Sequence, residues 1–156
     1  MAHSVETRLS ELGITLPEAP APAANYLPFV ISGNLVFISG QLPVESGEMK
    51  YGGRLGEGVS LEDGQKAARL CAINILSQLK AALSGELEKT CRCVRLGGFV
   101  ACADGFNEQS KVINAASDLM VAAFGKAGRH ARAAVGVNAL PLGASVEIEA
   151  VFEVSP

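Results

Sequence analysis

Arg132 stands inside a run of small, uncharged residues that extends from Ala131 to Val137. An isolated arginine on a strand face can present its planar guanidinium to a confined space, where two parallel N–H groups suit a carboxylate. An arginine in such a place can equally be an exposed edge-strand charge or the ion-pair partner of Glu147 or Glu149. The residue type and its setting therefore leave carboxylate binding and a structural role open.

The two glutamates of the last predicted strand share one face, because residues two apart on a strand point the same way. If residue 138 pairs with residue 145 across the intervening turn, Arg132 lies on that face too. A slip of one residue would place the arginine and the glutamates on opposite faces. A carboxylate beside an arginine can orient or activate water. Solvated charges on an outer face are the alternative for Glu147 and Glu149.

Other chemistry-bearing residues point to no further site. Positive charge gathers between Lys126 and Arg132, where it can stabilise the end of a preceding helix, and His130 has no serine or acid at a motif spacing. No metal-ligand cluster and no phosphate-binding loop occurs, so no metal and no cofactor is predicted. The cysteines are interpreted as buried free thiols; they are Cys71, Cys91, Cys93 and Cys102.

Two helices are predicted from apolar residues at three- and four-residue steps. Ser60 and Asp63 have capping-box spacing at the start of the first helix, and Gly85 follows its end. Asn107 is predicted to cap the second helix, which Gly125 and Gly128 end. The two stripes are Ala68, Cys71, Ala72, Ile75, Leu79 and Leu83, and Val112, Ile113, Ala116, Leu119, Met120, Ala123 and Phe124.

Strands are predicted over 27–31, 34–39, 90–103, 131–138 and 145–153. The first two form a hairpin about Ser32-Gly33-Asn34, Gly97-Gly98 indicates a bulge, and 42–59 is a loop. The order β-β-α-β-α-β-β predicts an α+β fold, with one mixed sheet backed by two helices on one face. The uncovered face, with small residues on the 131–138 strand, favours self-association into a closed ring.

Length and composition indicate one globular domain preceded by an arm. The chain has 156 residues, of which 49% are hydrophobic and 19% charged. Residues 1–23 are interpreted as an N-terminal helix (3–12) and a Pro-rich arm, whose extended connector runs over 17–25, and residues 24–156 as a single domain. The net charge of −3 and pI of about 5.4 show no basic footprint, so nucleic acid is disfavoured as a partner. No signal peptide or bilayer-spanning run is found, so a cytoplasmic location is expected.

Two segments resemble the reactive-intermediate deaminase family, RidA (formerly YjgF), over roughly residues 24–154. The first runs from Gly33 to Pro43. The second comprises Ala131-Arg132-Ala133-Ala134-Val135, then Leu140-Pro141, then Val146-Glu147-Ile148-Glu149-Ala150. The chain departs from the family pattern at His130 and Ala134, where proline and cysteine are common, and its arm and 44–59 loop are longer. It therefore resembles a divergent branch.

The resemblance implies a bacterial chorismate-mutase-like fold, a homotrimer and sites between subunits. It implies that Arg132 grips a substrate carboxylate and that Glu147 activates water, with Tyr26, Ser39, Asn114 and Ala134 in the pocket. The implied activity is that of a 2-iminobutanoate/2-iminopropanoate deaminase-like hydrolase. Such an enzyme converts 2-imino or 2-enamino acids to 2-keto acids and ammonia without a cofactor.

Two other functions stay open. One is a non-catalytic trimer that binds a small keto acid or acts by protein contact. The other is an endoribonuclease, a label that some relatives carry and that the acidic pI argues against. Chorismate mutase is an analogue of the fold alone.

Overall fold

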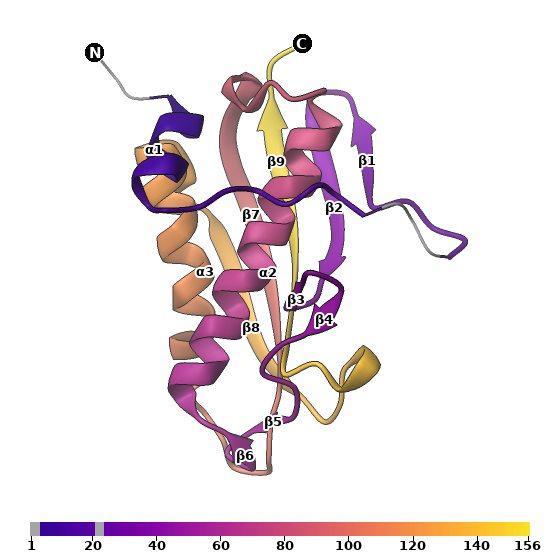
Figure 1. Cartoon of the computed structure of the whole chain (residues 1–156), viewed down its shortest axis with the longest axis vertical. Coiled ribbons are helices and arrows are strands. Elements are labelled where there is room, and N and C mark those ends of the chain that lie inside the picture. Colours follow the sequence, from indigo (N-terminus) through magenta and orange to yellow (C-terminus); the bar gives the residue numbers. More distant parts are fainter. Residues whose placement is uncertain (1–3, 21–23) are drawn as a thin grey trace.

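The structure, a computed structural model, describes residues 4–20 and 24–156. In this part of the chain, a short helix precedes a five-stranded sheet with two long helices (Figure 1). The main elements are α1 (Val5–Glu11), β1 (Phe29–Ser32), β2 (Leu35–Gln41), α2 (Leu61–Ala82), β7 (Thr90–Ala101), α3 (Gln109–Phe124), β8 (Ala131–Val137) and β9 (Val146–Val154). The short ones are β3 (Val44–Glu45), β4 (Glu48–Met49), β5 (Arg54–Leu55), β6 (Gly58–Val59) and the 3-10 turns η1 (Leu87–Lys89), η2 (Gly125–Gly128) and η3 (Pro141–Gly143).

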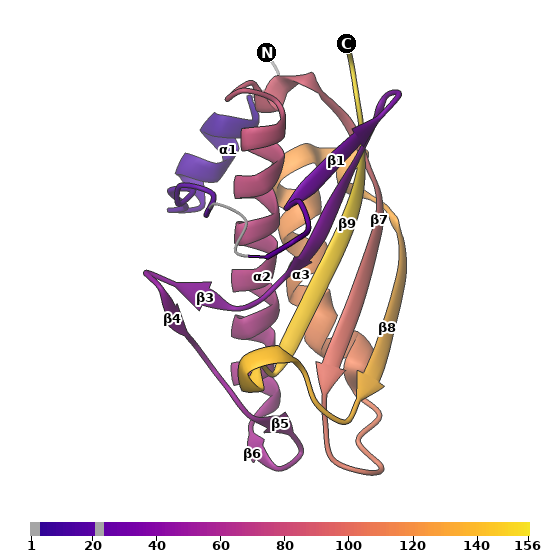
Figure 2. The same ribbon diagram turned by 90° about the vertical axis from the view of Figure 1, so that its right-hand side faces the viewer.

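The sheet has the strand order β1-β2-β9-β7-β8. Neighbouring strands are antiparallel except β7 and β8, which run parallel. Both long helices cover the same face, and the other face is uncovered (Figure 2). The predicted α+β fold, a mixed sheet backed by two helices on one face, is confirmed.

The core lies between the helices and the covered face of the sheet. Every residue of the two predicted helical stripes is buried. Along β9, Val146, Ile148 and Phe152 are fully buried and alternate with less buried residues, as a half-covered strand requires. Helical and strand periodicity therefore identified the core correctly.

Gly97 and Gly98 do not form the predicted bulge. The ladder between β7 and β9 is regular at both glycines, and its register shifts lie earlier, between Thr90 and Arg92 and between Cys93 and Arg95. A Cβ added at Gly98 would lie 2.7 Å from Ile113 Cδ1 of α3. The glycine is needed because α3 packs directly against the backbone of β7.

The helix boundaries test the predicted caps. Ser60 Oγ accepts a hydrogen bond of 3.1 Å from the Asp63 N–H, which confirms the N-cap of α2. The Asn107 cap is wrong, because Glu108 occupies the N-cap of α3 and makes no capping side-chain hydrogen bond. Gly125, with φ +64°, ends α3 as predicted. The 42–59 loop holds the short pairs β3–β4 and β5–β6.

The pairing of residue 138 with 145, one of the registers that the sequence left open, does not form. β8 pairs with β7 through Leu96↔Arg132 and Gly98↔Ala134, and β9 lies on the other side of β7. A strand that returns after a helical crossover joins its predecessor in parallel. β8 is therefore an edge strand, and residues 138–145 carry the chain past the end of β7.

The uncovered face of the sheet is largely apolar. Val30, Phe37 and Val135 are 50%, 44% and 45% exposed on it. Its charged residues include Arg95 and Glu149, whose side chains approach within 3.5 Å. A contiguous apolar face on a folded chain is typical of an interaction surface.

The N-terminal helix packs against the domain. Val5 and Leu9 are buried, and the Val5 N–H donates to Glu88 at 2.7 Å. The Arg8 guanidinium donates to the Ala123 carbonyl at the end of α3. The predicted helix 3–12 is thus found over Val5–Glu11, and residue 3 lies outside the described residues, as do residues 21–23 of the predicted 17–25 connector.

Buried thiols are confirmed at three of the four cysteines. Cys71, Cys93 and Cys102 are buried, and burial raises the pKa of Cys93 to about 12. Cys91 is exposed, so the prediction is wrong there. Within residues 4–20 and 24–156, no helix has the length and apolar character needed to cross a membrane.

Candidate functional site

Arg132 lies on the edge strand β8 and points to the side of the sheet that carries the helices. Its Nη1 donates to Asn114 Oδ1 at 2.8 Å and to Ser117 Oγ at 3.1 Å, both on α3. A guanidinium has five N–H donors, and the Nε–Nη2 edge has no partner among the described residues. That edge is a pair of parallel donors, already held in place and suited to a carboxylate.

Ser117 is a residue that the sequence analysis missed. Its Oγ lies 2.9 Å from His130 Nε2, and His130 Nδ1 lies 2.6 Å from the Gly128 carbonyl. Because a carbonyl only accepts, Nδ1 carries the proton, and a neutral His130 accepts from the Ser117 hydroxyl. The same oxygen can then accept from Arg132. Asn114 and Ser117 are three apart on α3, a spacing that puts both on one helical face and offers a sequence signal.

The backbone beside Arg132 is open on the outer edge of β8. The Val137 carbonyl accepts from the Cys102 N–H, so the odd-numbered residues of β8 turn their polar groups toward β7. Directions alternate along a strand, and residues 132, 134 and 136 therefore turn theirs to the unpaired edge. The Ala134 N–H is a free donor on the same strand as Arg132. Arg132, Asn114, Ser117 and Ala134 form what we call the arginine cluster.

Glu147 lies elsewhere. It is opposite Phe99 on β9 and points to the uncovered face, while its neighbour Ile148 points to the core. Its carboxylate sits against Gly40, where any side chain would collide with it. Partial burial, and secondarily the charge of Glu149, raise the pKa of Glu147 above its ordinary value. No hydrogen bond from a described residue stabilises this carboxylate.

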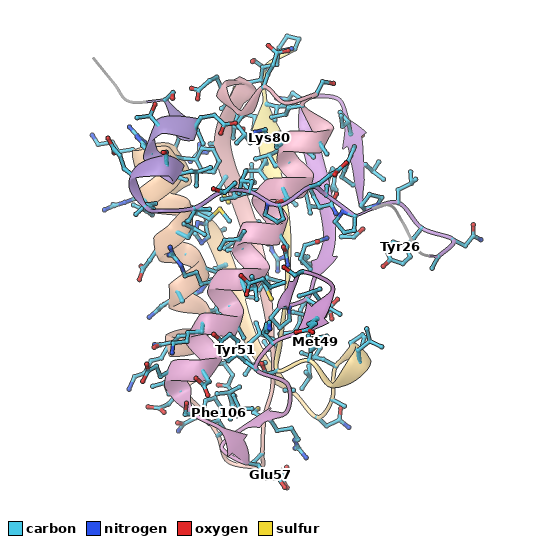
Figure 3. The ribbon with its side chains drawn as sticks, viewed as in Figure 1. Tyr26, Met49, Tyr51, Glu57, Lys80 and Phe106 are labelled. Carbon is cyan, nitrogen blue, oxygen red and sulfur yellow. The ribbon has the colours of Figure 1, made fainter. Side chains whose placement is uncertain are left out.

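Ser39 and Tyr26 belong to the β1–β2 side of the sheet, at the opposite edge from β8 and Arg132. Ser39 is one residue before Gly40, and its hydroxyl donates to the Leu27 carbonyl at 2.7 Å. Tyr26 is 61% exposed, on the segment before β1, far from α3 in the view of Figure 3. Glu147, Gly40, Ser39 and Tyr26 form what we call the glutamate cluster.

Within one chain the two clusters do not meet. β8 and β9 are separated by β7, which puts them about 10 Å apart. Arg132 and Glu147 also point to opposite faces, so the arrangement in which they share a face, one of the two that the sequence left open, does not occur. Arg132 has no ion pair with Glu147 or Glu149 among the described residues, and Glu149 pairs with Arg95.

Neither cluster offers a metal site. In the described part of the chain, no three His, Cys, Asp or Glu side chains are grouped closely enough to hold a metal ion. What the arginine cluster offers is a carboxylate receptor with a free backbone donor beside it. What the glutamate cluster offers is a carboxyl group whose pKa is raised toward the range useful for proton transfer.

Known proteins resemble the whole domain. Residues 6–153 match the family model described as "YjgF/chorismate mutase-like, putative endoribonuclease". Protein TCP17 of Trypanosoma cruzi is 47% identical over 152 residues, which cover 97% of this chain and 94% of that protein. The crystal structure of Atu1372 from Agrobacterium tumefaciens, a protein of unknown function, has a TM-score of 0.92 at 54% identity and covers 97% of this chain and 92% of its own. RidA from Psychrobacter sp. PAMC 21119 has a TM-score of 0.61 at 29% identity, over 88% of this chain and 94% of its own.

Proposed function

This chain belongs to the YjgF/RidA family, and on that premise we propose that it hydrolyses reactive 2-imino and 2-enamino acids to 2-keto acids and ammonia. The observation that carries the proposal is the state of Arg132. Nη1 is held by Asn114 and Ser117 while the Nε–Nη2 edge is free. A receptor of this kind suits a small 2-substituted carboxylic acid, whose reacting carbon is adjacent to the carboxylate.

A second copy of the chain would complete the site. The arginine cluster of one copy meets the glutamate cluster of the next in this proposal, because one chain cannot bring them together. The two surfaces differ, so the contact is head-to-tail, and such contacts close into a ring. The resemblance to the family implies three copies. The apolar uncovered face of the sheet supports assembly, since a ring would remove Phe37 and Val135 from water.

The proposed chemistry needs only these residues and water. Arg132 and the Ala134 N–H hold the substrate in a fixed orientation, so that the attack by water becomes effectively unimolecular. Glu147 takes a proton from a water molecule as the water oxygen bonds to the imine carbon. Glu147 returns this proton to the imine nitrogen as the carbon–nitrogen π bond opens, which gives a carbinolamine. The carbinolamine hydroxyl then passes its proton through Glu147 to the nitrogen, and the carbon–nitrogen bond breaks to release ammonia and the 2-keto acid. The raised pKa of Glu147 supports its use as both proton acceptor and donor.

The test is to generate imino acids with an amino-acid oxidase and trap them with semicarbazide. We expect the protein to slow semicarbazone formation and Arg132→Ala to abolish that effect. Truncating one partner of a buried charge pair costs about 2–5 kcal/mol, or about thirty- to several-thousand-fold in kcat/KM. Arg129→Ala is the matched control, because Arg129 is an exposed cation three residues away. Unchanged hydrolysis in Arg132→Ala would refute the assignment.

Mixing variants tests where the site lies. Arg132→Ala and Glu147→Ala are each expected to be inactive. If they are unfolded together and refolded as mixed rings, about a quarter of the interfaces will carry both native residues and activity will return to about that level. No recovery in verified mixed rings would show that the two residues do not meet between subunits.

A non-catalytic carboxylate receptor is the second candidate, and the free guanidinium edge favours it equally. Calorimetry with a simple keto acid would then show saturable binding that depends on Arg132, while trapping rates stay at background. Ribonuclease activity, which the family description names, would need RNA cleavage that copurifies with the protein and is unaffected by Arg132→Ala.

A further inference from the structure

A cavity of about 880 Å³ lies over the outer side of α2. Its walls come from the N-terminal arm, the segment that follows β2, and α2 between Arg69 and Gln78. Figure 1 shows the arm crossing in front of α2, above β3 and β4. The volume is within the range of small-molecule sites. The cavity borders the glutamate cluster at Tyr26 and Gly40, but no residue of the arginine cluster lines it.

Gln78 is the polar group that marks this cavity as built for a ligand. The residue is 2% exposed and lines the cavity. Its amide has no hydrogen-bond partner in residues 4–20 or 24–156. Polar groups in native interiors are nearly always paired. The Gln78 amide atoms are not among the fully buried side-chain atoms without a partner, so they face the open cavity, where water or a ligand pairs with them.

Arg69 is a second side chain of the cavity wall that has no partner in the described part of the chain. It is half-buried on the cavity wall and makes no ion pair with any residue that the structure describes. The acids of the wall, Glu18 and Glu45, are exposed and lie beyond ion-pair distance of it. By contrast Lys66, one turn earlier on α2, is exposed and pairs with Glu62 at 3.4 Å. An arginine is always charged, so Arg69 offers an unpaired cation that suits an anionic group in the cavity.

The surface between these two groups is apolar. Leu70 and Ile73 come from α2, and Leu12 and Ile14 come from the arm. The Asn74 side-chain amide donates hydrogen bonds to the Leu42 and Val44 carbonyls at 2.9 and 3.0 Å, which holds the segment after β2 in place as the opposite wall. Arg69 and Gln78 are nine residues apart, which is about 13 Å along the axis of α2.

We propose that this cavity binds an elongated amphipathic carboxylate. The carboxylate pairs with Arg69, the chain lies over Leu70 and Ile73 beneath the arm, and a polar group at the far end pairs with the Gln78 amide. An extended chain advances about 1.2 Å per bond, so about eleven bonds cover the axial distance; because nine residues also turn α2 by about two and a half turns, the ligand crosses the helix obliquely. The cavity shares Tyr26 and Gly40 with the glutamate cluster, but the contacts at Arg69 and Gln78 involve no residue of the arginine cluster.

The test measures ligand binding to the full-length protein by calorimetry. The ligands are 10-hydroxydecanoate and, for comparison, decanoate and 1,10-decanediol, each below its aggregation limit. We expect saturable binding of 10-hydroxydecanoate, weaker binding of decanoate and little binding of the diol. Arg69→Gln should weaken both acids about tenfold or more, because it removes a charge-assisted contact. Gln78→Leu should abolish the advantage of 10-hydroxydecanoate over decanoate. This variant keeps the core filled, and thermal melts will verify that it folds.

Two control variants make the proposal falsifiable. Lys66→Gln removes a cation from the same helix outside the cavity and should leave binding unchanged. Arg132→Ala should also leave it unchanged, which separates this site from the hydrolytic one. Absence of saturable binding at millimolar ligand would overturn the proposal. So would binding that Arg69→Gln leaves intact, or binding that Lys66→Gln or Arg132→Ala reduces as much as Arg69→Gln does.

Discussion

Gly98→Ala tests how closely α3 packs against the sheet. The new Cβ would lie 2.7 Å from Cδ1 and Cγ1 of Ile113 and 3.0 Å from its Cγ2, all of them in the core. Overpacking of this kind costs about 1–3 kcal/mol. Alanine in place of a strand glycine recovers about 0.5–1 kcal/mol of backbone entropy. The free energy of unfolding should therefore fall by about 1–2 kcal/mol, a decrease in Tm of about 2–8 °C for a chain of this length.

Urea unfolding followed by circular dichroism measures this change, and a double-mutant cycle identifies its cause. Ile113→Ala removes all three atoms that the new Cβ meets, and alone it should cost about 2–5 kcal/mol. In the Gly98→Ala background it should cost about 1 kcal/mol less, because it relieves the clash. Stabilisation by Gly98→Ala, or strict additivity in the cycle, would refute the close packing of α3 on β7.

Three other perturbations have defined outcomes. Glu147→Gln should raise the free energy of unfolding at neutral pH. The folded-state pKa of Glu147 is raised, so ionisation of Glu147 penalises the native state at pH values above the ordinary glutamate pKa. The gain from Glu147→Gln should vanish below about pH 4, where Glu147 is protonated in both the folded and the unfolded state. Ser117→Ala should lower kcat/KM for imine hydrolysis about two- to tenfold, because one hydrogen bond to Arg132 is lost. Ser117→Thr should restore kcat/KM. Ser110→Ala, at an exposed position of the same helix, should leave kcat/KM unchanged. Ser60→Ala should lower the free energy of unfolding by about 1 kcal/mol in urea titrations through loss of the N-cap, and an unchanged midpoint would contradict that role.

Several local features could be predicted because neighbours along the chain determine them. The buried stripes of α2 and α3 follow from the helical repeat, and the Ser60 cap depends on an amide three residues away. The turn at Gly33, with φ +61°, needs only a residue that tolerates that angle. The candidate residues Arg132 and Glu147 were found by residue type and by resemblance, without any knowledge of their surroundings.

Errors arose where partners are distant in the chain. Gly97-Gly98 was interpreted as a bulge, because a sequence does not show that α3 will approach the backbone there. Ser117 was overlooked, because its contact with His130 and Arg132 exists only after α3 packs beside β8. The strands 131–138 and 145–153 were considered as neighbours whose register the sequence left open, whereas β7 occupies the place between them.

The amino-acid sequence alone determined the helices, the strand faces and the fold class, because short-range periodicity and capping specify them. Only the tertiary structure decided the strand order, and with it the separation of the arginine and glutamate clusters onto opposite faces. It also decided that the Gln78 side chain, which is 2% exposed, would turn its amide to a cavity with no hydrogen-bond partner among the described residues. Such outcomes depend on which distant segments pack together, and the free energy of that packing belongs to no single stretch of the chain.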